Sequence, residues 1–188
     1  MKIAVYCSSV DSLPEEWQEA ARITGRWIGN HGAQLVYGVV DAGLMSVTAR
    51  ACKEAGGTVV GVVPMRRADR AASINDVQVP TSDLNDRKGV MQLLADAFVV
   101  LPGGYGTLDE FATSFSYINF THHRDKRIII YNPEGFYDPL LDQYRRMIER
   151  GLMTADRMEI LDIVDTPDQI TKALDRFIAF LQQLQAVK

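Results

Sequence analysis

Short runs rich in valine and isoleucine recur along the chain, and they alternate with longer stretches whose apolar residues fall at helical spacing. The short runs are mostly continuous in apolar character, which is typical of strands buried on both faces of a parallel sheet. They predict strands at residues 2–7, 33–38, 58–64, 97–102, 127–132 and 160–165.

The longer stretches predict helices at 14–30, 43–55, 84–96, 107–120, 138–150 and 167–185. The first begins at Pro14 and is followed by Gly32, with proline at the start and glycine past the end. Strands and helices in alternation predict a three-layer α/β fold with a doubly wound, mainly parallel sheet. We expect a single domain over residues 1–188, with the least regular stretch, 65–80, as a surface loop at one sheet edge.

Composition and charge narrow the class of protein. The chain has 188 residues, 47% of them hydrophobic, which is enough to build a core without disulfides or metals. A net charge of −4 makes a general affinity for nucleic acid unexpected. No apolar run approaches the about 18 residues of a membrane span, and the start turns polar too soon for a signal peptide. Cys7 and Cys52 are expected to be core thiols of a cytoplasmic protein.

Ligands of such sheets bind beyond the carboxyl ends of the strands, so the loops after the strands carry the candidate chemistry. The first loop lacks the G-x-G-x-x-G of dinucleotide folds, which argues against NAD or FAD. Its Ser8 and Ser9 are either ligand donors or turn residues. The second loop carries Gly38 and Gly43 near a helix start, which can hold a phosphate but is equally an ordinary strand-to-helix turn.

The third loop, "PGGYGT" at 102–107, carries the strongest signal. Glycines let backbone approach a ligand closely, and successive N–H groups in such a turn form an anion cradle. Thr107 and Glu110 also fit a capping box, S/T-x-x-E, in which the glutamate serves the helix rather than a reaction. From spacing alone, both interpretations of Glu110 stay open.

Arg87 changes that balance. It falls on the apolar stripe defined by Leu84, Met91, Leu94 and Phe98. An arginine on a buried face needs a carboxylate or phosphate partner, either as a structural ion pair or as part of a site. Lys88 lies about 100° further round the helix and faces either the same cleft or solvent.

"DRK" at 86–88, followed by "PGGYGTLDE" at 102–110, resembles the paired signature of the Lonely Guy family. The resemblance extends through "IAVYCSS", "GLMS", "GGTVVGVVP" and "GFYDPLL", over nearly the whole chain. It implies a Rossmann-like fold, a homodimer or larger assembly, and hydrolysis of the N-glycosidic bond of a nucleoside 5′-monophosphate, such as a cytokinin riboside monophosphate or AMP. It implies no cofactor and no metal. Nothing in the chain looks like the pyridoxal-phosphate lysine site of a lysine decarboxylase, a label often given to similar proteins.

Carried over by position, the resemblance implies that Arg87 and Glu110 are the catalytic pair. The implied substrate-binding residues are Lys88, Gly103, Gly104, Tyr105, Gly106, Thr107, Ser116, Gly43 and Met45. Asp69 aligns only loosely with a family glutamate.

The chain departs from the family pattern at the second loop. Relatives usually have glycines where this chain has Val39 and Val40, and another glycine at Ser46. β-Branched residues resist positive φ and block close backbone approach, and Asp41 would repel a phosphate placed beside it. These departures favour either the main alternative, a non-catalytic nucleotide or molybdenum-cofactor carrier of similar fold, or an enzyme with a shifted substrate.

Overall fold

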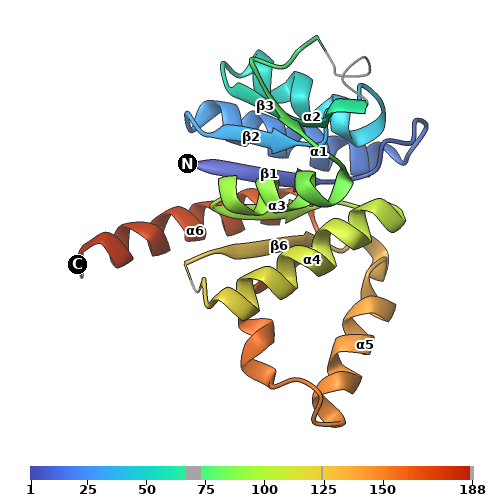
Figure 1. Ribbon diagram of the computed structural model, residues 1–188, viewed down its shortest axis with the longest axis vertical. Coiled ribbons are helices and arrows are strands. Elements are labelled where there is room, and N and C mark those ends of the chain that lie inside the picture. The colour runs from blue at the N-terminus through green and yellow to red at the C-terminus, as the bar shows by residue number, and fades with distance from the viewer. Residues whose placement is uncertain (67–72, 124, 187–188) are drawn as a thin grey trace.

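The computed structural model describes residues 1–66, 73–123 and 125–186 (Figure 1). The sheet has seven strands in the order β4-β3-β2-β1-β5-β6-β7, and every neighbouring pair is parallel. The strands are β1 (Lys2–Tyr6), β2 (Gln34–Tyr37), β3 (Thr58–Pro64), β4 (Val77–Thr81), β5 (Ala97–Val100), β6 (Arg127–Tyr131) and β7 (Leu161–Val164).

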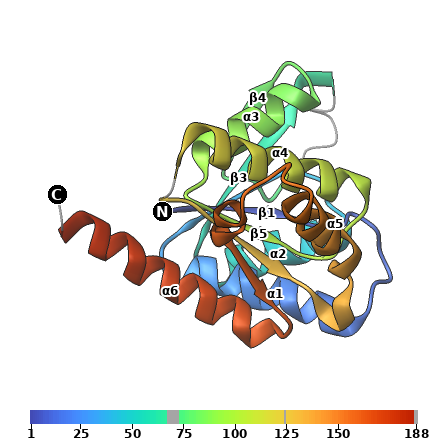
Figure 2. The same ribbon diagram turned by 90° about the horizontal axis from the view of Figure 1, so that it is seen from below.

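Helices cover both faces of this sheet. They are α1 (Glu15–Asn30), α2 (Gly43–Glu54), α3 (Leu84–Leu94), α4 (Tyr105–Thr121), α5 (Asp138–Glu149) and α6 (Pro167–Ala186). Figure 2 shows α1, α2 and α6 on one side of the sheet and α3 and α4 on the other. The predicted three-layer, single-domain α/β fold is therefore confirmed.

The continuous apolar strands follow from this double cover. In β1, Ile3 and Val5 enter the core beneath α1, α2 and α6, whereas Ala4 and Tyr6 enter the core beneath α3 and α4. Successive side chains of a strand point to opposite faces, so in a strand buried on both sides every side chain enters a core and an apolar residue is favoured at each position. Cys7 and Cys52 are buried free thiols, as the sequence predicts.

One strand was not predicted. Residues 77–80 fall in the stretch 65–80 that we expected to be loop, but together with Thr81 they form β4, which pairs with β3 at the edge of the sheet. Val77 is 46% exposed, and Pro80 lies within the strand. An edge strand tolerates proline and polar residues, so its pattern differs from that of the buried strands.

The order of the strands reverses at β1. β2 to β4 lie on one side of it and β5 to β7 on the other, so the topological switch point, beyond which such sheets bind their ligands, lies between β1 and β5. The loop 102–107 leaves β5 at this point, and the first loop leaves β1 beside it, where the Ser8 N–H donates to the Pro102 carbonyl. In the part of the chain that the structure describes, no helix has the length and apolar character needed to cross a bilayer.

Candidate active site

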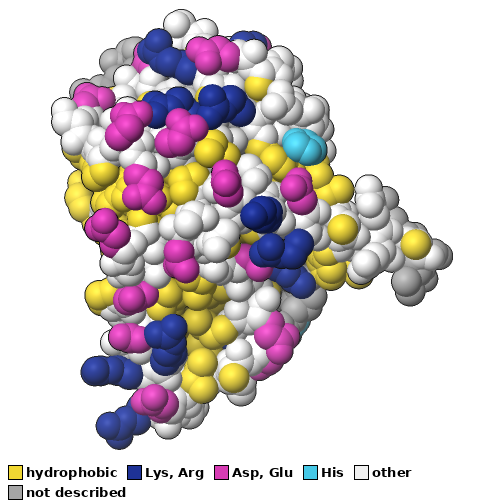
Figure 3. Space-filling model, turned by 180° about the vertical axis from the view of Figure 1, so that it is seen from behind, with side chains coloured by type: hydrophobic (Ala, Val, Ile, Leu, Met, Phe, Trp, Pro, Cys, Tyr) yellow, Lys and Arg dark blue, Asp and Glu magenta, His cyan; other side chains and the backbone are white. Residues whose placement is uncertain are grey.

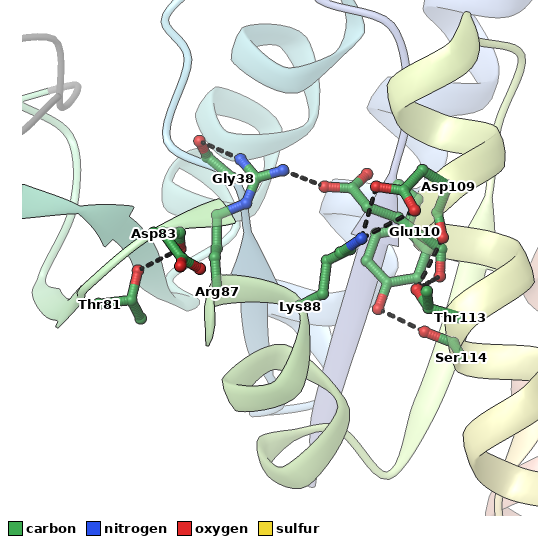
Figure 4. A network of polar contacts seen from close by, with 10 residues as sticks. Gly38, Thr81, Asp83, Arg87, Lys88, Asp109, Glu110, Thr113 and Ser114 are labelled. Atoms are coloured by element: carbon green, nitrogen blue, oxygen red, sulfur yellow. Dashed lines mark hydrogen bonds and ion pairs between the residues drawn. The ribbon is translucent and has the colours of Figure 1, made fainter. Parts of the chain in front are cut away.

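Arg87 and Glu110 meet across the gap between α3 and α4. The Arg87 Nη2 group donates to the Glu110 Oε1 atom at 2.5 Å (Figure 4). The Glu110 side chain is 4% exposed and that of Arg87 15%. The predicted convergence of these two side chains is therefore present, and the pair is largely withdrawn from water.

Burial raises the pKa of the Glu110 carboxyl to about 7, because loss of hydration penalises the charged form. The Arg87 guanidinium opposes this rise, as does Lys88 more weakly, whereas Asp109 adds to it. A carboxyl with a pKa near neutrality can exchange protons with a substrate or water at physiological pH.

Gly38, at the end of β2, holds the other end of the Arg87 guanidinium. Its carbonyl accepts from Arg87 Nη1 at 3.5 Å. A Cβ atom at position 38 would lie 2.7 Å from that nitrogen, so a larger residue would push the guanidinium away from its present position. Arg87 Nε is buried and has no hydrogen-bond partner among the described residues.

The capping-box interpretation of Glu110 is wrong. Helix α4 begins at Tyr105, two residues earlier than predicted, and Gly104 is its N-cap. Thr107 therefore lies inside the helix, where its buried side chain packs against Gly103. Among the residues that the structure describes, no side chain caps the start of α4, so its first N–H groups have no side-chain acceptor there.

Glycine is present for different reasons at different positions of this loop. A Cβ at Gly103 would lie 2.1 Å from the Thr107 hydroxyl oxygen, so packing requires glycine there. At Gly104 and Gly106 a Cβ would meet nothing within 4 Å, and neither residue has positive φ. The fold does not require glycine at these two positions, where the backbone faces open space beside the exposed Tyr105.

The start of α2 is different, because a carboxylate of the chain itself accepts a hydrogen bond from it. The Gly43 N–H donates to Asp11 Oδ1 at 3.0 Å. Asp41 accepts from the Ser46 hydroxyl and from Arg50, and these contacts lower its pKa. This loop retains a positive φ at Val39, where φ is +65° despite the β-branched side chain.

The other residues predicted for the site have different surroundings in the structure. Met45 is 8% exposed and belongs to the core beneath α1 and α2. Lys88 and Ser116 line the same hollow, of about 450 Å³, between α3 and α4. Ser8 accepts a hydrogen bond from the Val10 N–H, which is a turn role. Asp69 lies outside the described residues.

Sequence reasoning missed three contacts of the site. They are the Gly38 carbonyl on Arg87, the Asp109 carboxylate on Lys88, and the Tyr6 hydroxyl bonded at 2.9 Å to Ser114, one turn after Glu110. Asp83, which caps α3 by accepting from the Asn85 and Asp86 N–H groups, was recognisable as an aspartate before an apolar-periodic run. The other contacts join segments far apart in sequence and leave no local signal.

The sheet order and its two helical layers define a Rossmann-like α/β protein. A family model described as "Possible lysine decarboxylase" matches residues 45–174, well over half of the chain. The chain belongs to this family, the Lonely Guy family indicated by its motifs.

Named enzymes of plants are among its relatives. The chain is 32% identical, over 94% of its length and 74% of the relative's, to the cytokinin riboside 5′-monophosphate phosphoribohydrolase LOG of Oryza sativa. It is 30% identical to a cytokinin riboside 5′-monophosphate phosphoribohydrolase of Arabidopsis thaliana, over 94% of this chain and 82% of that one.

Solved structures share the fold at lower identity. The molybdenum cofactor carrier protein of Chlamydomonas reinhardtii superposes with a TM-score of 0.72 at 20% identity, covering 95% of this chain and 98% of that one. The molybdenum cofactor binding protein of Rippkaea orientalis gives 0.72 at 21% identity, with 94% and 96% covered. At these identities the likeness extends to the fold alone.

Proposed function

We propose that the protein hydrolyses the N-glycosidic bond of a nucleoside 5′-monophosphate and releases a free base and ribose 5-phosphate. One observation carries the proposal: a buried carboxyl–guanidinium pair lies at the switch point of the sheet, beside a helix start that no side chain in the described part of the chain caps. The plant relatives named as phosphoribohydrolases support the same reaction.

The substrate phosphate binds at the start of α4 in this proposal. The free N–H groups of the first turn and the positive end of the helix dipole favour an anion there. Gly104 and Gly106 leave the approach open. The start of α2, the other candidate of the sequence, already holds the Asp11 carboxylate and has Asp41 beside it. These acids disfavour a phosphate at α2.

Glu110 acts on the sugar. Cleavage of the bond between C1′ and the base builds positive charge on the ribose ring, and a carboxylate nearby stabilises that charge or orients the attacking water. Water adds its hydroxyl to C1′ and its proton passes to the departing base, so the reaction needs no co-reactant. Arg87 orients Glu110 and offers the remaining N–H groups of its guanidinium to ribose or phosphate oxygens.

A product screen tests this proposal. Purified protein is incubated with purine and pyrimidine 5′-monophosphates, with AMP and a cytokinin riboside monophosphate among them, and the matching nucleosides serve as controls. We expect free base and ribose 5-phosphate in equal amounts from at least one monophosphate, and far less base from its nucleoside. Absence of base from every monophosphate would contradict the proposal.

The alternative is a non-catalytic nucleotide or molybdenum-cofactor carrier. The altered second loop favours it, since Val39 and Asp41 stand where relatives have a glycine-rich turn. The intact pair of Arg87 and Glu110 favours the enzyme, because a carrier has no use for a buried carboxyl poised to exchange protons. Tight binding of a nucleotide without release of base would identify the carrier.

A further inference from the structure

A second ion pair lies beside the first, between the next residue of each helix. Lys88 follows Arg87 on α3, and Asp109 precedes Glu110 on α4. The Lys88 Nζ atom lies 2.8 Å and 2.6 Å from the two carboxylate oxygens of Asp109 (Figure 4). The two helices are therefore joined by two parallel pairs of charges.

The two partners of this second pair are unequally exposed. The Lys88 side chain is 12% exposed, whereas that of Asp109 is 54% exposed. A nearly buried ammonium group requires an anionic partner, because losing both water and a counterion is unfavourable. The Asp109 carboxylate is well solvated, so it can leave Lys88 for water at little cost once another anion takes its place.

We propose that Asp109 is an internal counterion of Lys88 that the phosphate of a ligand displaces on binding. The inference rests on the proposed function for the identity of that ligand. Asp109 lies four residues after Tyr105, or about 6 Å along the helix axis, so Lys88 is close to the uncapped start of α4. A phosphate dianion there competes for the ammonium group, whereas a neutral nucleoside does not. Asp109 thereby acts as a positioning residue that holds Lys88 in place before a ligand binds, and it weakens the binding of a phosphate without affecting that of a neutral nucleoside.

Calorimetric titration with ribose 5-phosphate tests the competition without requiring turnover. Asp109→Asn removes the internal competitor, so ribose 5-phosphate should bind about fivefold more tightly, the equivalent of about 1 kcal/mol. Adenosine, which carries no phosphate, should bind equally well to both proteins. Asp109→Glu, which keeps the charge, should restore the weaker binding of ribose 5-phosphate.

A Lys88→Met background provides the matched control. If Asp109 acts through Lys88, Asp109→Asn gives no gain in affinity once the lysine is absent. An unchanged affinity in Asp109→Asn, or a gain that persists with Lys88→Met, overturns the counterion proposal. Should Lys88→Met fail to fold, the comparison of Asp109→Asn with Asp109→Glu still decides, because residue 109 is largely exposed.

The two proposals fail in different experiments. Base released from AMP together with unchanged binding in Asp109→Asn rejects the counterion and keeps the hydrolase. Tighter binding of ribose 5-phosphate in Asp109→Asn, with no base released by any variant, keeps the counterion and rejects the hydrolase.

Discussion

At the scale of single residues, the site depends on two groups with opposite effects on one pKa. Burial makes the Glu110 carboxyl difficult to ionise, and the Arg87 guanidinium makes its ionisation easier. Removing one partner of a buried charge pair leaves the other without compensation, which typically costs 3–5 kcal/mol. Glu110 escapes part of this penalty by taking up a proton, since its pKa is raised to about 7. The protonation state of Glu110 is therefore the property of the site most sensitive to its neighbours.

The pH dependence of kcat/KM should report this carboxyl. If the ionised form acts on the ribose, kcat/KM falls as the pH drops below about 7. Arg87 lowers the pKa of Glu110, so Arg87→Met should raise it and move the acid limb to higher pH. Steady-state rates across pH 5 to 9 measure the acid limb of the unaltered protein and that of Arg87→Met. An acid limb that stays in place in Arg87→Met would show that another group titrates.

The sequence predicted the need of Arg87 for a partner but not which carboxylate would meet it. An arginine on an apolar stripe must be paired, and that follows from spacing alone. Glu110 remained ambiguous because a capping box and a catalytic glutamate have the same spacing. The structure separates them through the backbone of Gly104, which becomes the N-cap and moves the helix start to Tyr105. That choice depends on local φ and ψ, which the pattern of side chains does not specify.

At the scale of elements, α1 and α2 approach each other through glycine. A Cβ at Gly25 would lie 2.3 Å from the Thr48 carbonyl oxygen, and one at Gly29 would lie 2.7 Å from that of Cys52. These are backbone atoms of α2, which cannot rotate away as a side chain can. The two glycines, one turn apart on α1, thus set the distance between the helices and hold the start of α2 near the site.

Gly25→Ala should lower the free energy of unfolding by about 2 kcal/mol or more, because the helices must separate to admit the methyl group. Gly89→Ala is the matched control. Gly89 lies within α3, has open space around its Cβ position and does not have positive φ. Alanine there should stabilise the protein by about 0.5–1 kcal/mol. Urea denaturation of both variants measures the difference, and equal effects would contradict this account of α1.

The helices and buried strands were predictable to within a few residues, whereas β4 was not. The inner strands are buried on both faces, and this burial imposes continuous apolar runs that the sequence displays. β4 is bonded along one side only, so solvent accepts its polar residues and Pro80. What identifies it as a strand is its ladder with β3, which no local pattern encodes.

At the scale of the whole molecule, the order of the strands creates the site. The loops after β1, β2 and β5, together with α3 and α4, bring residues as distant as Tyr6, Gly38 and Glu110 together. The sequence predicts a parallel sheet, but it does not state which strand lies at the centre.

On the face turned away from Figure 1, acidic and basic side chains are interspersed with apolar patches (Figure 3).

The resemblance also predicts a homodimer or larger assembly. Phe120 and Leu152 are 83% and 79% exposed, and both line a hollow of about 580 Å³ between α4 and the segment after α5. We expect light scattering to give the mass of two or more chains, and Leu152→Glu to shift it toward one. Val77→Glu, on the exposed edge strand β4, is the control. A single-chain mass at every concentration would contradict the assembly.

The most direct test of the central claim is the rate of base release from AMP by Glu110→Gln compared with the unaltered protein. The substitution keeps the size of the side chain and removes its charge. With the variant folded, as judged by circular dichroism and thermal melting, kcat should fall by about 100-fold or more. Turnover at the unaltered rate would show that Glu110 takes no part in the chemistry and would contradict the account.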